Sequence, residues 1–126
     1  LADGLADLGQ QLKRPELAHL PLCFVGMSAG GGMSVQFAEQ LPDRTIAAAP
    51  VCLEVGPTTA AGRGIPMLTV FGERDGKQME LLLAKLPEAR KQGALWAIAP
   101  QWGRKHEFGA ANNLVIPFFD SCISLR

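Results

Sequence analysis

The sequence predicts an α/β protein with a mostly parallel sheet and helices on both of its faces. Two observations lead to this expectation. Short apolar runs lack the polar alternation of strands that face water on one side, and segments with helical spacing separate them along the chain. Because the 126 residues contain no internal repeat and no change in composition, we expect a single domain spanning residues 1–126.

The elements follow one another as helix, strand, helix, strand, loop, strand, helix, strand and helix. The four expected strands cover residues 22–25, 45–49, 66–71 and 95–99. The expected helices cover residues 2–14, 29–41, 77–86 and a terminal segment over 114–122. Pro87 is expected to break or restart the third helix and Gly93 to close it, and Pro117 is expected to lie near the first turn of the last helix. Residues 56–64, rich in Gly, Pro and Thr, are expected to form a surface loop.

Charge and cysteine content narrow the classes of function. Lys plus Arg and Asp plus Glu are 12 each, so the formal net charge is zero and nothing suggests a nucleic-acid groove. No apolar run approaches the roughly 20 residues of a membrane span. Three cysteines cannot all pair within the chain, and no C-x-x-C spacing suggests a zinc or thioredoxin-like motif. We expect the cysteines to be small buried hydrophobic residues.

The motif with the clearest chemistry is Gly-Met-Ser-Ala-Gly over residues 26–30, which has the G-x-S-x-G form of a nucleophile elbow. It directly follows a predicted strand and opens a predicted helix. Small neighbours allow Ser28 to stand clear of the backbone on a tight turn, and the free N–H of Ala29 at the helix start can bind a developing oxyanion. The alternative is a glycine-rich strand–helix turn that binds phosphate.

A serine nucleophile needs a base with a pKa near neutrality, and only two histidines are present. His106 lies in a polar loop after the last predicted strand. Ligand sites in parallel sheets lie beyond the carboxyl ends of the strands, which is where this loop belongs. His19 precedes the strand that leads to Ser28 and therefore belongs to the opposite edge. We expect His106 to be the base.

The acid that orients this base is expected after a strand between Ser28 and His106. Both Asp75 and Glu73 follow the third predicted strand, and we favour Asp75 because a turn ending in glycine can aim its short carboxylate inward. Glu54, after the second strand, is a weaker option. Glu107 is the direct neighbour of the histidine, and adjacent side chains rarely face each other, so we discount it.

The chain order Ser28, Asp75, His106 is that of the α/β-hydrolases. Together with residues 26–33 (Gly-Met-Ser-Ala-Gly-Gly-Gly-Met), 42–51 and 66–72, it makes the chain resemble the carboxyl-terminal half of an α/β-hydrolase, closest to the polyhydroxybutyrate-depolymerase-like and feruloyl-esterase-like members. The resemblance implies a serine esterase that acts on a small-molecule or polymeric ester without a metal or organic cofactor. A serine peptidase, a thioesterase and a catalytically inactive binding protein on the same fold are the alternatives.

The resemblance also implies parts that these residues do not supply. Such a fold has about eight strands, so we expect the leading strands and the second oxyanion donor to lie upstream of Leu1. Because loss of one oxyanion donor costs roughly 10²–10³ in turnover, the 126-residue chain by itself is expected to be poorly active. Met27 in the elbow and Trp102 before His106 are expected to line the substrate site.

Overall fold

The centre of the protein is a four-stranded, fully parallel sheet with the strand order β1-β2-β3-β4. The computed structural model describes all residues 1–126. The strands are β1 (Leu22–Met27), β2 (Thr45–Val51), β3 (Met67–Gly72) and β4 (Trp96–Gln101). The predicted parallel sheet of about four strands is confirmed. Each strand continues one or two residues beyond its predicted carboxyl end, so the strands reach closer to the loops that carry the candidate residues.

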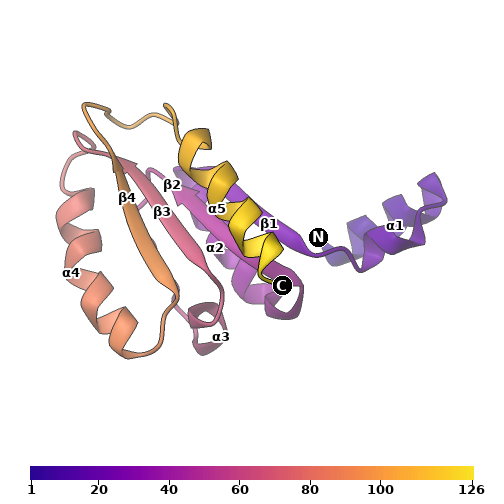
Figure 1. Cartoon of the computed structure of the whole chain (residues 1–126). Helices are drawn as coiled ribbons and strands as arrows, with labels where there is room; N and C mark the ends of the chain where they lie inside the picture. The colour runs from indigo at the N-terminus through magenta and orange to yellow at the C-terminus, as the bar shows by residue number, and fades with distance from the viewer.

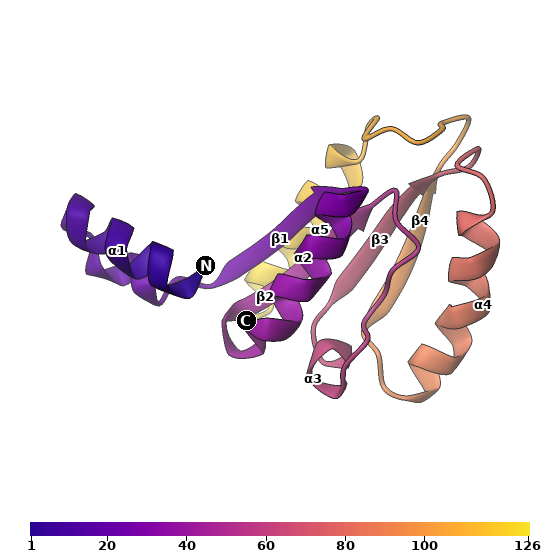
Figure 2. The ribbon, with the colours of Figure 1, turned by 180° about the vertical axis from the view of Figure 1, so that it is seen from behind.

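Helices cover both faces of the sheet, as expected (Figures 1 and 2). On one face lie α2 (Ala29–Gln40), α4 (Gln78–Lys91) and the short α3 (Ala60–Arg63). On the other face α5 (Asn112–Ser124) packs against β2 and β3. In Figure 1, α5 lies in front of the sheet, and the half-turn of Figure 2 brings α2 forward instead.

Each face of the sheet has its own apolar core, which explains why the strands lack polar alternation. The core under α2 and α4 consists of Val35, Ala38, Ala48, Ile65, Met67, Phe71, Leu82, Ala94 and Trp96. The core under α5 consists of Ala49, Val51, Cys52, Val70, Ala111 and Val115. In β2 the neighbours Ala48 and Ala49 point to opposite cores and are both fully buried. Their small side chains let helices approach this strand from both sides.

The first helix stands apart from the sheet at the side of β1 (Figure 1). It is α1 (Ala2–Leu12), and it ends because Lys13 adopts a left-handed conformation with φ 54°. Its main contacts are with the 3₁₀ turn η1 (Pro15–Ala18) that follows. A second 3₁₀ turn, η2 (Pro42–Arg44), leads into β2. None of the helices combines the length and the apolar character that crossing a bilayer requires.

Three local expectations were wrong. The predicted loop over 56–64 contains α3, which begins because the Thr59 hydroxyl accepts a hydrogen bond from the N–H of Gly62. Pro87 lies inside α4 instead of ending it. That proline is exposed, so water can satisfy the helix carbonyl that it leaves without a donor. Because α5 already begins at Asn112, Pro117 lies in its second turn and not in its first.

Candidate active site

The turn between β1 and α2 holds Ser28 in a strained conformation. Ser28 has φ 53° and ψ −120°, and residues other than glycine rarely adopt such a backbone conformation with positive φ. Its N–H donates to the carbonyl of Val51 at 2.8 Å, and its carbonyl accepts from the N–H of Gly31 at 2.8 Å. Such strain persists only where the surroundings over-determine it, and it gathers at functional sites. The geometry is that of the sharp strand-to-helix turn that G-x-S-x-G predicts.

The glycines around Ser28 have unequal roles. A Cβ at Gly26 would overlap the carbonyl oxygen of Gly30, so only glycine allows the chain to double back this tightly. A Cβ at Gly31 would lie 3.2 Å from the carbonyl oxygens of both Gly26 and Val51, which shows how closely α2 presses on the sheet. Gly30 has no atom within 4 Å of the position of its absent Cβ. The tight turn therefore depends on the first glycine of the motif and not on the second.

The Ser28 side chain is free to act on another group. Its hydroxyl makes no capping hydrogen bond to α2, and the residue is partly exposed. Ala29 occupies the first helical position of α2 and is exposed, so its N–H has no partner within the helix. An exposed hydroxyl beside an unpaired N–H is the arrangement expected of a nucleophile and one oxyanion donor.

The loops after β3 and β4 bring Asp75 and His106 together. The Nδ1 atom of His106 lies 3.0 Å from Oδ1 and 3.1 Å from Oδ2 of Asp75. The Asp75 side chain is only 8 % exposed, whereas that of His106 is 45 % exposed. With Nδ1 directed at the carboxylate, the Nε2 atom is left without a protein partner. The pair has the geometry of a base that a buried acid orients.

A close approach of two loops places His106 over the sheet edge. A Cβ at Gly72 would overlap the carbonyl oxygens of Lys105 and Arg104, so the segment before His106 lies directly on the end of β3. The N–H of Arg74 donates to the Arg104 carbonyl at 2.7 Å. The thiol of Cys52, after β2, donates to the carbonyl of Glu107 at 3.1 Å. The loop thus crosses back over β3 to the end of β2, the neighbour of the strand that leads to Ser28.

None of the three glutamates that were alternatives to Asp75 contacts His106. Glu73 does not face His106, because its carboxylate accepts a hydrogen bond from the N–H of Gly103 at 2.7 Å and so anchors the same loop. Glu107 pairs with Arg104 at 3.6 Å. Glu54 contributes its backbone carbonyl to Lys85.

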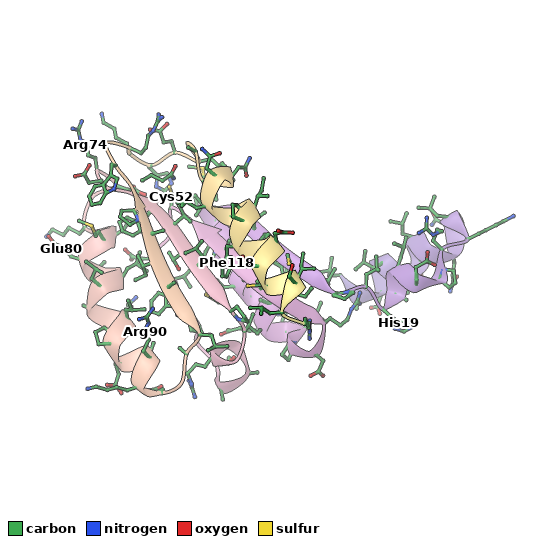
Figure 3. All side chains as sticks on the ribbon, viewed as in Figure 1. His19, Cys52, Arg74, Glu80, Arg90 and Phe118 are labelled. Carbon is green, nitrogen blue, oxygen red and sulfur yellow. The ribbon has the colours of Figure 1, made fainter.

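The two histidines lie at opposite ends of the molecule. His19 is exposed beside α1, whereas Cys52 and Arg74 mark the other end of the sheet (Figure 3). His106 lies at this second end, because its partners belong to the loops there. The expectation that His19 belongs to the wrong edge is confirmed.

Two further residues at this edge of the sheet contribute to the site, although no sequence pattern pointed to them. Gln101 is buried, and its amide accepts from the N–H of Ala110 at 2.8 Å and donates to the Phe108 carbonyl at 3.2 Å, which closes the loop around His106. Cys52 is fully buried with φ 52°, and its sulfur lies within 4.8 Å of donor atoms of Asp75 and His106. Burial, together with the negative charge of Asp75, raises the pKa of the Cys52 thiol.

The structure places the two predicted substrate-binding residues differently. Met27 packs partly against the core under α5. Trp102 is 74 % exposed and lines a cavity of about 360 Å³ beside Arg104 and Leu114. None of the four cavities is lined by Ser28, Asp75 or His106. A role in substrate binding stays a prediction for Met27 and Trp102.

Comparisons with known proteins support this description of the fold. No family model and no curated protein matches the sequence. Arabidopsis thaliana SOBER1 superposes with a TM-score of 0.65 over 96 % of this chain, at 18 % identity. A carboxylesterase from the thaumarchaeon Nitrososphaera gargenis superposes with a TM-score of 0.64 over 98 % of the chain and 73 % of its own length, at 13 % identity. A predicted CIB-like hydrolase from Thermoplasma acidophilum superposes with a TM-score of 0.55 over 96 % of the chain and 59 % of its own, at 17 % identity.

The chain has the fold of the α/β-hydrolases, as the resemblance implied. It spans 61 % of the length of SOBER1.

Proposed function

We propose that this protein is a serine hydrolase that cleaves carboxylic esters through an acyl-enzyme on Ser28. The observation that carries the proposal is the contact between His106 and the buried carboxylate of Asp75, on the same sheet edge as the strained turn of Ser28. A lone serine in a tight turn has no base, and a lone His–Asp pair has no nucleophile. Their presence on one edge supports acyl transfer as the chemistry.

Each residue has one role in the proposed mechanism. The Oγ of Ser28 attacks the ester carbonyl carbon while Nε2 of His106 takes the hydroxyl proton. Asp75 keeps the other imidazole proton on Nδ1 and stabilises the imidazolium. The alcohol then leaves with the proton that His106 returns. Water repeats the sequence on the acyl-enzyme, which releases the acid and restores Ser28.

The negative charge that develops on the ester carbonyl oxygen must be stabilised by hydrogen-bond donors that are already in place before the reaction. The N–H of Ala29 is one such donor in our proposal. A second donor is not assigned within the 126 residues, and we propose that the whole protein supplies it. The chain by itself is then expected to acylate slowly. Brisk ester turnover by the isolated chain would contradict this part of the proposal.

We propose an ester as the substrate, in preference to other acyl compounds, because of the proteins whose structures are similar to this chain. One of them is a carboxylesterase and another is called a hydrolase. A thioesterase or a peptidase would use the same three residues, so the triad by itself does not distinguish them. A binding protein that has kept the fold without the chemistry would form no acyl-enzyme at all.

The test is to expose the chain to p-nitrophenyl acetate, an acetyl thioester and a peptide p-nitroanilide, and to follow both product release and acyl transfer to protein by mass spectrometry. We expect an acetyl group on Ser28 and release of p-nitrophenol, both absent in Ser28→Ala. Ser124→Ala is the matched control, since that serine is exposed at the far end of α5. Equal rates for Ser28→Ala and the wild-type chain would overturn the proposal.

A further inference from the structure

The sulfur of Cys52 lies close to the Asp75–His106 pair. One sulfur, one carboxylate oxygen and one imidazole nitrogen lie within 4.8 Å of one another, and they come from the loops after β2, β3 and β4. We call these three residues the Cys52–Asp75–His106 cluster. We propose that the cluster is a binding site for Zn²⁺, and that an ion bound there removes His106 from its role as a base.

The donor set favours zinc over the common hard cations. Cysteine sulfur, histidine nitrogen and carboxylate oxygen are the protein ligands of Zn²⁺, whereas Mg²⁺ and Ca²⁺ take oxygen ligands and gain nothing from a thiol. Three protein ligands leave the fourth tetrahedral position to water. No short sequence motif indicates this metal site, because 22 and 30 intervening residues separate the three ligands.

The distances suit a tetrahedral ion after a small movement of one side chain. With metal–ligand distances of about 2.0–2.3 Å, nitrogen and oxygen ligands lie roughly 3.3 Å apart and sulfur and nitrogen ligands roughly 3.6 Å apart. The nitrogen and the oxygens of the cluster are already 3.0–3.1 Å apart. If the nitrogen must move closer to the sulfur, the His106 side chain is the one that moves. It is the exposed member of the cluster, whereas Cys52 and Asp75 are buried.

The backbone holds the Cys52 sulfur at this place without metal. The N–H of Cys52 donates to the Val70 carbonyl at 2.8 Å, and its side chain reaches the loop of His106 at Glu107. The thiol donates a hydrogen bond to the Glu107 carbonyl at 3.1 Å. Zn²⁺ would displace that proton to solvent and bind the thiolate.

Binding has a direct consequence for the imidazole. A neutral imidazole that ligates a metal through Nδ1 carries its proton on Nε2. That nitrogen then donates and cannot accept the Ser28 proton. The inhibitory consequence rests on the proposed hydrolase function, whereas metal binding itself does not depend on it.

Absorption spectroscopy with Co²⁺ tests the site without any need for turnover. We expect Co²⁺ to give the chain tetrahedral visible bands and a near-ultraviolet sulfur-to-cobalt band, and Zn²⁺, but not Mg²⁺, to abolish both. Cys52→Ser should lose the sulfur-to-cobalt band, and Cys122→Ser, the matched control on α5, should keep it. Absence of the band in the wild-type chain, or its persistence in Cys52→Ser, overturns the proposal.

A second variant covers the case in which Cys52→Ser does not fold. His106→Gln changes an exposed ligand and should weaken Co²⁺ binding at least about tenfold. Unchanged affinity in this variant overturns the site. Labelling of Ser28 by a fluorophosphonate separates the two proposals. Cobalt binding without any labelling of Ser28 supports the metal site and counts against the hydrolase function. Labelling of Ser28 without cobalt binding supports the hydrolase function and counts against the metal site.

Discussion

Ser28 is positioned mainly by its immediate neighbours, with one hydrogen bond to Val51 of β2, whereas His106 is positioned by residues from other parts of the chain. The turn of Ser28 needs glycine two residues earlier and closes on the first turn of α2. His106 contacts an acid 31 residues earlier and rests on the end of a different strand. The nucleophile is therefore a local feature of backbone geometry, and the acid–base pair is a product of tertiary packing. Different substitutions should disturb the two parts independently.

Removing the base is the largest disturbance that we expect. His106→Gln keeps the size of the side chain and cannot take the Ser28 proton, so the rate of ester cleavage by the whole protein should fall on the order of 10⁶-fold, or to the background rate. The check is the rate of p-nitrophenol release from p-nitrophenyl acetate. His19→Gln, at the opposite end of the sheet, is the matched control and should leave the rate unchanged. A rate for His106→Gln within tenfold of wild type would exclude His106 as the base.

Replacing the acid Asp75 should lower the rate of ester cleavage less than replacing His106 does. Replacing Glu73 should lower it much less again. Asp75→Asn should lower the rate about 10⁴-fold, because an amide holds the imidazole in the wrong tautomer. Glu73→Gln removes only the carboxylate that accepts from Gly103. It should cost about 1 kcal/mol of unfolding free energy and lower the rate less than about tenfold. Ester cleavage and urea unfolding of both variants measure these effects, and a reversed order of the two rates would make Glu73 the orienting acid.

The contact between the loops can be broken without touching either catalytic side chain. Gly72→Ala places a methyl group where the carbonyls of Arg104 and Lys105 lie, so the loop of His106 must move. A displacement of about 1 Å should cost on the order of 10² in rate. The expected nuclear magnetic resonance signature is a shift of the His106 ring signals with those of Ser28 unchanged. Wild-type rate and spectra would show that the close approach does not position His106.

Substitutions of the two elbow glycines should change the stability of the fold by different amounts. Gly26→Ala should destabilise the fold by about 1–3 kcal/mol, because its Cβ would overlap the Gly30 carbonyl. Gly30→Ala adds a methyl group to open space in the first turn of a helix and should be neutral or stabilising by up to about 1 kcal/mol. Thermal unfolding of both variants decides the matter. Equal destabilisation would mean that the motif needs glycine at both positions.

The same contrast explains which features could be predicted from sequence. The four strands and the helices α1, α2 and α5 depend on local patterns, and their bounds lie within two residues of the predicted ones, whereas α3 was missed and α4 runs past Pro87. The roles of Glu73 and Gln101 depend on hydrogen bonds to residues 30 positions away for Glu73 and 7 and 9 positions away for Gln101, which no local pattern shows. The position of Cys52 beside His106 has the same origin. The turn that ends in Gly76 favoured Asp75 over Glu73, and Asp75 is the acid that contacts His106.

The most direct test of the hydrolase assignment is covalent labelling by a fluorophosphonate, with the modified residue identified by peptide mass spectrometry. The reagent reacts with a serine that a base activates, and it needs no turnover. The account predicts a label on Ser28 alone, lost in Ser28→Ala, strongly slowed in His106→Gln and unchanged in Ser124→Ala. Absence of label from the wild-type chain, or equal labelling of the wild type and His106→Gln, would contradict the claim that Ser28, Asp75 and His106 act as one catalytic unit.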